Sequence, residues 1–175
     1  MFKNILVAFD GSEAARQGLA TGLALATDQH ATLFVLNVVE GMPAAWSPYV
    51  DEQFRPTRIQ VLLEGLRAAA QKILDEARDI ALRDGQATKP LLVYPRGGSA
   101  ADVILAQARE VNADIVVLGT HGRTGVSRLV TGSTAESVLR RAEVPVLLVR
   151  ANAKALGPRI ARPVTADCTE QALTA

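Results

Sequence analysis

The sequence predicts a doubly wound α/β fold, in which a parallel sheet is covered by helices on both faces. Five short apolar runs rich in β-branched residues alternate with longer segments in which apolar residues recur at helical spacing. The runs are almost continuously apolar, which is typical of strands buried on both sides. Strands and helices that alternate in this way form βαβ units and hence a mostly parallel sheet. The five runs are Ile5–Phe9, Thr32–Val39, Leu91–Tyr94, Ile115–Leu118 and Val144–Val149.

Four apolar stripes predict the helices between these strands. They run from Ala15 to Ala26, Ile59 to Ile80, Ile104 to Val111 and Ala135 to Ala142. In doubly wound sheets, ligands bind beyond the carboxyl ends of the strands, where the winding direction reverses. The residues that follow the first, second and fourth strands are therefore the candidates for a site.

Composition narrows the class of protein. The chain has 175 residues, enough for one domain, and a net charge of +1, which offers no overall field for nucleic acid or an anionic membrane. Its single cysteine, Cys168, excludes an internal disulfide and a cysteine-cluster metal site. No apolar run is long enough to cross a membrane, and the N-terminus does not have the pattern of a signal peptide. We expect a soluble cytoplasmic protein that neither binds nucleic acid nor inserts into a membrane.

Two segments do not fit the βαβ pattern. Residues 40–55 form a connection that is long for an α/β unit and carries Trp46, Tyr49 and Phe54; they could form a lid, a partner surface or an ordered surface loop. Residues 151–175 lose the helical and strand periodicity and contain Gly157, Pro158 and Pro163. We expect a domain over 1–150 and a flexible tail over 151–175.

The segment from Gly119 to Ser133 combines three features that favour phosphate binding. Its glycines let the backbone approach a ligand closely, and Gly132-Ser133 opens a helix whose free amides attract an anion. Exposed amides in such a turn form an anion cradle. Residues 119–141 also hold four arginines and one glutamate, a local charge of +3 in a nearly neutral chain. The segment is therefore the candidate phosphate site.

Each feature also has a structural explanation. Ser133 with Glu136 has the pattern of a helix capping box, and the glycines could be turn residues. The spacing matches neither the Walker pattern nor Gly-x-Gly-x-x-Gly. Gly97-Gly98-Ser99 also suggests a phosphate loop, but Ser99 with Asp102 is explained by a helix cap alone.

The joint spacing resembles the nucleotide-binding signature of the universal stress protein family: Gly-x-x-Gly, nine residues, then Gly-Ser or Gly-Thr. Gly119, Gly122, Gly132 and Ser133 fit this signature without a gap. The opening Asn4–Ser12 and the closing Val144–Val149 also resemble the family, so the likeness covers about residues 1–150. It implies a five-stranded sheet of order 3-2-1-4-5 and bound ATP, with Mg²⁺ (or Mn²⁺) on the phosphates.

The same resemblance implies roles for individual residues. It assigns Asp10 to the ribose and the phosphate-bound metal, and the Val39 backbone to the adenine edge. Asp10 with Ser12 is also explained by a turn and N-cap for the first helix. His121, which lies between two glycines, is expected to contact phosphate or ribose, or to face solvent, rather than to catalyse. The complete expected nucleotide-binding set is Ala8, Asp10, Gly11, Ser12, Val39, Gly119, Thr120, His121, Gly122, Arg123, Gly132, Ser133 and Thr134.

A nucleotide cradle without an evident catalytic group predicts an ATP-binding regulatory protein of the stress response with little or no turnover. The alternative is a slow ATPase or self-phosphorylating enzyme of the adenine-nucleotide α-hydrolase superfamily, although the Ser-Gly-Gly-x-Asp-Ser loop of its pyrophosphatases is missing after the first strand. A phosphorylation receiver domain needs an acidic pair where this chain has Asp10-Gly11. The last strand, 144–149, would be an apolar edge, and family members pair it across a two-fold axis, so we expect a homodimer.

Overall fold

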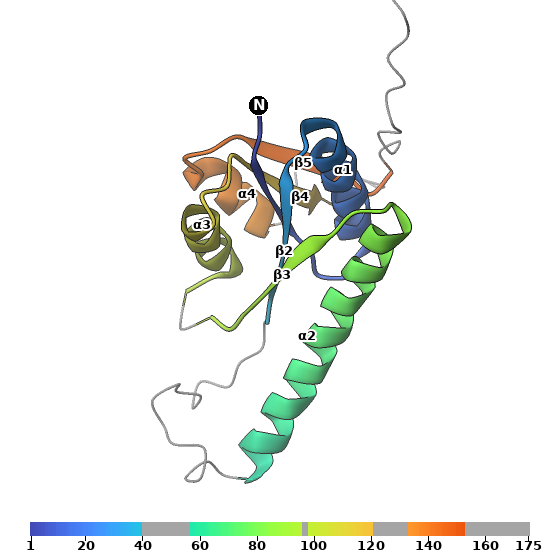
Figure 1. Cartoon of the computed structure of the whole chain (residues 1–175). Helices are drawn as coiled ribbons and strands as arrows, with labels where there is room; N and C mark the ends of the chain where they lie inside the picture. Colours follow the sequence, from blue (N-terminus) through green and yellow to red (C-terminus); the bar gives the residue numbers. More distant parts are fainter. Residues whose placement is uncertain (40–56, 96–97, 121–132, 153–175) are drawn as a thin grey trace, which may run out of the picture.

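The computed structural model describes residues 1–39, 57–95, 98–120 and 133–152. Its centre is a five-stranded sheet in the order β3-β2-β1-β4-β5, and all four strand pairs are parallel (Figure 1). The predicted doubly wound fold and the strand order 3-2-1-4-5 are confirmed. The strands are β1 Asn4–Ala8, β2 Thr32–Val38, β3 Thr88–Val93, β4 Ile115–Thr120 and β5 Val146–Arg150; the helices are α1 Glu13–Gln29, α2 Thr57–Arg83, α3 Ala100–Glu110 and α4 Ser133–Arg141.

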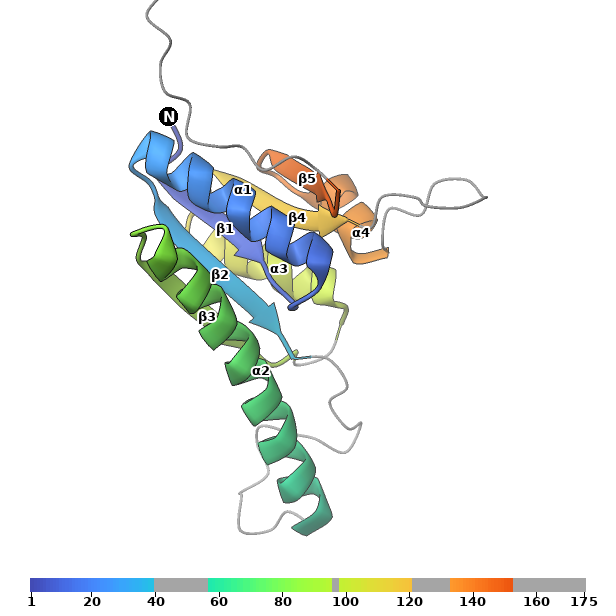
Figure 2. The ribbon, with the colours of Figure 1, turned by 90° about the vertical axis from the view of Figure 1, so that its right-hand side faces the viewer.

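Helices cover both faces of the sheet, as predicted. On one face α1 and α2 bury a cluster that includes Leu19, Leu74 and Val117; on the other, α3 and α4 bury a second cluster around Leu6, Ile104 and Val138 (Figure 2). Successive side chains of each central strand point to opposite faces, so one apolar strand supplies both clusters.

The third strand begins earlier than its apolar run. The run predicted a strand over Leu91–Tyr94, whereas β3 spans Thr88–Val93 and includes Pro90, which lies opposite Val35 of β2. Proline is tolerated in a strand at the edge of a sheet, where its missing N–H would face away from the neighbour. Because β3 is an edge strand, Pro90 does not end it.

Close packing of α1 on β4 depends on a glycine. A Cβ atom added to Gly119 would lie 2.3 Å from the Ala14 carbonyl carbon and 2.4 Å from its oxygen. Gly18 of α1 faces the same point, because its added Cβ would lie 3.3 Å from the Gly119 nitrogen. Gly119 therefore has a packing role that is independent of any ligand, and it brings the end of β4 beside the start of α1.

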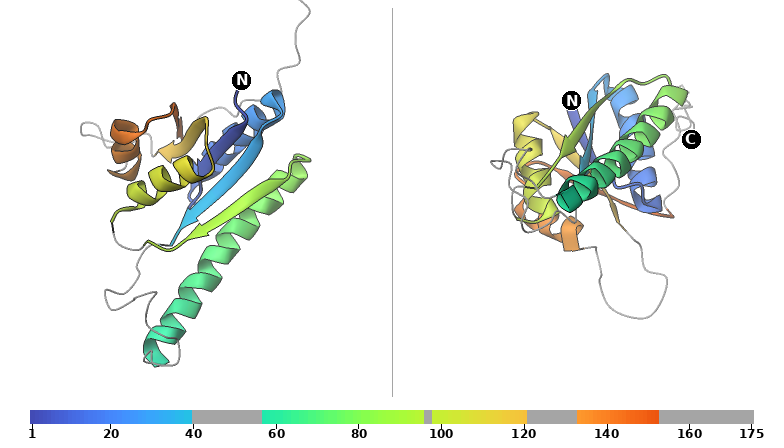
Figure 3. Two further views of the ribbon diagram at one scale, coloured as in Figure 1. Left: turned by 60° about the vertical axis from the view of Figure 1, so that its left-hand side comes forward. Right: turned by 90° about the horizontal axis from the view of Figure 1, so that it is seen from below.

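Helix α2 is the longest helix, with 27 residues. Its C-terminal part packs on β2 and β3, and its N-terminal part extends past the carboxyl ends of the strands (Figure 3). Val61 and Leu62, in this extension, are 63% and 48% exposed, whereas Leu74 and Ala77, farther along, are buried. Within the described part of the chain, none of the helices is both long and apolar enough to span a membrane.

Candidate functional site

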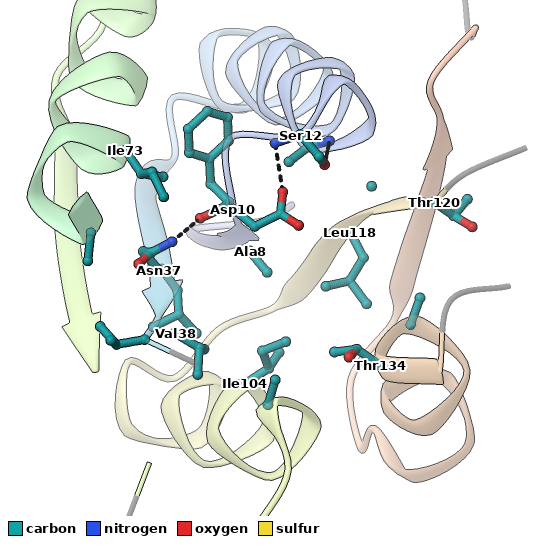
Figure 4. A pocket seen from close by; sticks show the side chains of 18 of the residues that line it. Ala8, Asp10, Ser12, Asn37, Val38, Ile73, Ile104, Leu118, Thr120 and Thr134 are labelled. Atoms are coloured by element: carbon teal, nitrogen blue, oxygen red, sulfur yellow. Dashed lines mark hydrogen bonds between the residues drawn. The ribbon is translucent and has the colours of Figure 1, made fainter. Parts of the chain in front are cut away.

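A cavity of about 450 Å³ opens at the carboxyl ends of β1, β2 and β4, between α2 and the start of α4. This is the edge at which ligands bind in doubly wound sheets. Figure 4 shows Asn37, Val38 and Ile73 on one side of the cavity and Thr120 and Thr134 on the other, with Asp10 and Ser12 between them. The lining residues are Ala8, Phe9, Asp10, Ser12, Ala15, Leu36, Asn37, Val38, Val39, Leu66, Ala69, Ala70, Ile73, Ala100, Ile104, Leu118, Gly119, Thr120, Ser133, Thr134 and Ala135.

The turn after β1 positions the acidic residue of the cavity. Gly11 adopts a φ of +78°, a conformation that strongly favours glycine. The turn lets the Ser12 N–H donate to Asp10 Oδ1 at 2.9 Å, and the Ala15 N–H donate to Ser12 Oγ at 3.1 Å (Figure 4). Ser12 is thus the N-cap of α1, and the turn-and-cap explanation of these residues is confirmed. One Asp10 oxygen supports the turn, and the exposed carboxylate still borders the cavity.

The start of α4 forms the second polar wall. Ser133 is the first helical residue, and Ser133 and Thr134 both line the cavity. No hydrogen bond joins Ser133 and Glu136 in the described residues, so the capping box considered for them is not seen; Glu136 Oε1 accepts instead from Arg140 Nη2 at 2.9 Å and Nε at 3.1 Å, one turn farther along. Amides in the first turn of a helix have no intrahelical acceptor, so this wall favours an anion.

Two of the four arginines in the charged segment are already paired with acids. Arg140 bonds Glu136, and Arg141 donates to Asp102 Oδ1 at 2.6 Å. Both arginines lie in the last turn of α4, whereas Ser133 at the cavity is in its first turn. Arg140 and Arg141 therefore do not add positive charge at the cavity. The other two arginines of the segment, Arg123 and Arg128, lie outside the described residues.

The second glycine-serine segment is structural, as expected. Ser99 is the N-cap of α3: its Oγ accepts from the Asp102 N–H, and Asp102 Oδ2 accepts from the Ser99 N–H at 2.6 Å. The Ser99 N–H and hydroxyl, which both donate to Asp102 Oδ2, and then Arg141 lower the pKa of the Asp102 carboxyl to about 2. The Asp102 carboxylate thus stabilises the N-terminus of α3. Ser99 does not line the cavity.

The end of the cavity under α2 is apolar, and the sequence did not predict that α2 would line it. Leu66, Ala69, Ala70 and Ile73 of α2 line it opposite Val39. The Val39 N–H donates to the Val93 carbonyl of β3 at 2.9 Å, so of the Val39 backbone groups the carbonyl is the one left for a ligand. The apolar stripe predicted α2 itself; its place over the end of β2 follows from long-range packing that the stripe does not encode.

The structure brings most of the expected site residues together. Ala8, Asp10, Ser12, Val39, Gly119, Thr120, Ser133 and Thr134 line the cavity. Gly11 shapes the turn and is absent from the lining. The remaining expected residues, His121, Gly122, Arg123 and Gly132, lie outside the described residues, as do loop 40–55 and residues 153–175 of the tail.

A comparison with known protein families shows which family the chain belongs to. The model of the universal stress protein family matches residues 1–150. This chain belongs to the universal stress protein family. The match includes both walls of the cavity, and the predicted family is confirmed.

Relatives of known structure share the family fold. A universal stress family protein from Burkholderia pseudomallei is 34% identical, with a TM-score of 0.64 over 84% of this chain and 95% of its own. A universal stress protein solved in complex with cAMP is 26% identical, with a TM-score of 0.61 over 85% of this chain and 97% of its own. A curated protein of Staphylococcus aureus, named as a universal stress protein, is 31% identical over 85% of this chain and 84% of its own length.

The described part of the cavity offers one carboxylate ligand for a divalent cation. Asp10 is the only acidic side chain among the described lining residues, and no group of three or more His, Cys, Asp or Glu side chains gathers in the described ranges. A single carboxylate fits a Mg²⁺ ion that is held mainly by phosphate oxygens and water, which is how Mg²⁺ is usually bound. It does not fit a metal held by protein side chains alone.

Proposed function

We propose that the cavity binds an adenine nucleotide, and that the ligand in the cell is ATP with Mg²⁺ (or Mn²⁺). The observation that carries the proposal is the division of the cavity into an apolar end under α2 and a polar end made by Asp10, Ser12 and the start of α4. A nucleotide has the same division, with a flat base at one end and phosphates at the other. The cAMP complex of a related universal stress protein supports an adenine nucleotide in particular.

The residue roles follow from this orientation. Ala8 and the Val39 carbonyl would border the adenine, and Asp10 would accept ribose hydroxyls or hold Mg²⁺ against the phosphates. The first-turn amides of α4, with Ser133 and Thr134, would receive a phosphate. The loop residues Gly119, Thr120, His121, Gly122, Arg123 and Gly132 would complete the cradle, and Gly11 and Ser12 would hold the turn that presents Asp10.

The nucleotide acts as a signal in this proposal, and the protein is a cytoplasmic regulator of the stress response. Support comes from Asp10, which is the only acid among the described lining residues and already gives one oxygen to the Ser12 N–H. This carboxylate is assigned to the ribose or the metal, so no other described lining acid is left to activate a water molecule. We expect ATP turnover well below about 1 per second, the low end for ordinary enzymes. Faster steady turnover would instead favour an enzyme of the adenine-nucleotide α-hydrolase superfamily.

The nucleotide that copurifies with the protein tests the proposal. Protein purified from cells, denatured and separated by chromatography should release an adenine nucleotide, and Gly122→Val should abolish that release. Gly125→Val is the matched control, because Gly125 lies in the same segment but outside the Gly-x-x-Gly spacing. Wild-type protein that is empty and also fails to bind added ATP with Mg²⁺ in calorimetry would contradict the proposal.

A further inference from the structure

Asn37 lines the cavity and carries a buried hydrogen-bond acceptor. The residue is 4% exposed, and Asn37 and Thr21 are the buried polar residues in the described ranges. The Thr21 hydroxyl is satisfied within α1, where it donates to the Gln17 carbonyl at 2.9 Å. Asn37 Nδ2 donates to the Phe9 carbonyl at 2.8 Å, but no described residue donates to Asn37 Oδ1. A buried acceptor without a donor is unfavourable, so this oxygen needs an explanation.

The orientation of the Asn37 amide is determined by its partner. The Phe9 carbonyl can only accept, so the group that faces it must be the NH₂ end of the side chain. The Phe9 backbone is itself held, because its N–H donates to the Leu36 carbonyl of β2 at 2.8 Å. Figure 4 shows the amide nitrogen directed toward the end of β1, with the oxygen on the opposite side of the amide. The acceptor therefore lies on the side of the amide that faces α2 and Ile73.

The surroundings of Asn37 indicate which part of a ligand would meet it. Asn37 lies at the α2 end of the cavity, near Ile73 and Val38 and away from Thr120 and Thr134 (Figure 4). The phosphates belong at the opposite, polar end, where the first-turn amides of α4 are located. The donor that reaches Asn37 should therefore come from the base.

We infer that Asn37 Oδ1 accepts a hydrogen bond from the exocyclic amino group of the bound purine and so selects adenine over 6-oxopurines. The inference rests on the proposed nucleotide function. An amino group at carbon 6 would give the buried oxygen the donor that no described residue supplies. A carbonyl at the same place, as in guanine or hypoxanthine, would set two acceptors against each other in an apolar environment. Such a mismatch is strongly unfavourable, because both oxygens lose their water.

Removal of the amino group from the ligand tests the inference without any mutation. Purine riboside triphosphate has a hydrogen where ATP has its amino group and keeps the ring nitrogens unchanged. We expect wild-type protein to bind it about tenfold more weakly than ATP in calorimetry with Mg²⁺, as for the loss of one hydrogen bond from a buried acceptor. Equal binding of the two nucleotides would overturn the inference and leave the proposed function intact.

A variant assigns the discrimination to Asn37. Asn37→Leu keeps the approximate size of the side chain and removes the acceptor, so it should bind ATP and purine riboside triphosphate within about twofold of each other. Thr21→Val removes the other buried polar group, which lies outside the cavity lining, and should keep the tenfold preference. If Asn37→Leu keeps the preference, the amino group is recognised elsewhere, for example by the Val39 carbonyl, and the inference is wrong.

A third nucleotide separates the base from the ribose as the source of the donor. We expect 2′-deoxy-ATP to lose the same affinity in wild-type protein and in Asn37→Leu. If the loss seen with 2′-deoxy-ATP disappears in Asn37→Leu, the oxygen accepts from the ribose, and base selection by Asn37 is overturned. If wild-type protein binds none of the three nucleotides, the proposed function fails, and the role of Asn37 fails with it.

Discussion

Gly119 is a residue at which packing and ligand binding must be separated by experiment. It lines the cavity and belongs to the family signature, yet its missing Cβ is explained by contact with the Ala14 backbone. Gly119→Ala should lower the free energy of unfolding by about 1–3 kcal/mol, because backbone atoms of α1 must move to admit the methyl group. Urea denaturation measures this change in nucleotide-free protein.

Gly65 is the control for the Gly119 substitution. It lies within α2, and an added Cβ would meet no atom within 4 Å. Gly65→Ala should therefore raise the free energy of unfolding by up to about 1 kcal/mol, through helix propensity alone. If Gly119→Ala is as stable as the wild type and only loses nucleotide, the packing role assigned to Gly119 is wrong.

Among the elements, α3 and α4 are joined through the Asp102 carboxyl. Hydrogen bonds from Ser99 and the nearby Arg141 lower the pKa of Asp102 from 3.8 to about 2 in the folded protein. Because the folded pKa is the lower one, ionised Asp102 stabilises the fold above about pH 4, and this contribution is lost as the pH falls toward 2. Asp102→Asn should flatten the pH dependence of the urea midpoint between pH 4 and pH 2.

The control for Asp102 removes one acidic charge elsewhere. Asp79 is an exposed residue on α2, 4.0 Å from Arg78, and Asp79→Asn should leave the slope between pH 4 and pH 2 close to that of the wild type. Equal slopes in Asp102→Asn and the wild type would show that the bonds at the start of α3 do not contribute to acid stability.

An ion pair joins α2, which lines the cavity, to α1. Arg16 Nε and Nη2 donate to the two Glu76 oxygens at 2.5 and 3.3 Å, with both side chains more than a third exposed. Glu76→Gln should weaken ATP binding by about two- to fivefold, because a partly exposed pair contributes roughly 0.2–1 kcal/mol to holding α2 in place. Isothermal calorimetry with ATP and Mg²⁺ measures the effect.

A second ion pair of the same geometry serves as the comparison. Arg109 Nη2 and Nε donate to Glu143 at 2.6 and 3.3 Å, and neither residue lines the cavity. Glu143→Gln should change stability by a similar small amount and leave ATP affinity unchanged. If the two variants lose affinity equally, the Arg16–Glu76 pair has no specific role in positioning α2.

At the scale of the whole molecule, β5 leaves one edge of the sheet open within the described residues. The Val116 N–H bonds the Pro145 carbonyl and the Ala151 N–H bonds the Thr120 carbonyl, so alternate residues of β5 serve β4. The Leu148 N–H then faces the open edge. We propose that this edge pairs with a second copy, and light scattering should give about twice the mass of the 18.6 kDa chain.

Removal of the Leu148 N–H tests whether β5 pairs with a second copy. Leu148→Pro removes a donor from the open edge without removing one from the bonds to β4, so it should yield a folded monomer with the circular dichroism of the wild type. A wild-type protein that is monomeric at micromolar concentration would contradict the dimer. A Leu148→Pro variant that stays dimeric would place the interface elsewhere.

The class of fold, the succession of elements and the residues at the carboxyl ends of the strands could all be predicted from the sequence. These features are local: continuous apolar runs mark buried strands, stripes mark helices, and Asp10-Gly11-Ser12 contains its own turn and cap. Because the carboxyl ends of parallel strands meet at one edge, motifs far apart in the chain could be assigned to one site.

Tertiary structure alone decided the rest. Pro90 is accepted in β3 because that strand lies at the edge of the sheet. Gly119 is required by the approach of α1, and the apolar end of the cavity exists because α2, packed on β2 and β3, supplies Leu66, Ala69, Ala70 and Ile73 to it. Each of these features depends on contacts between segments that are distant in sequence, and the periodicity of a single segment carries no information about which neighbour it will meet.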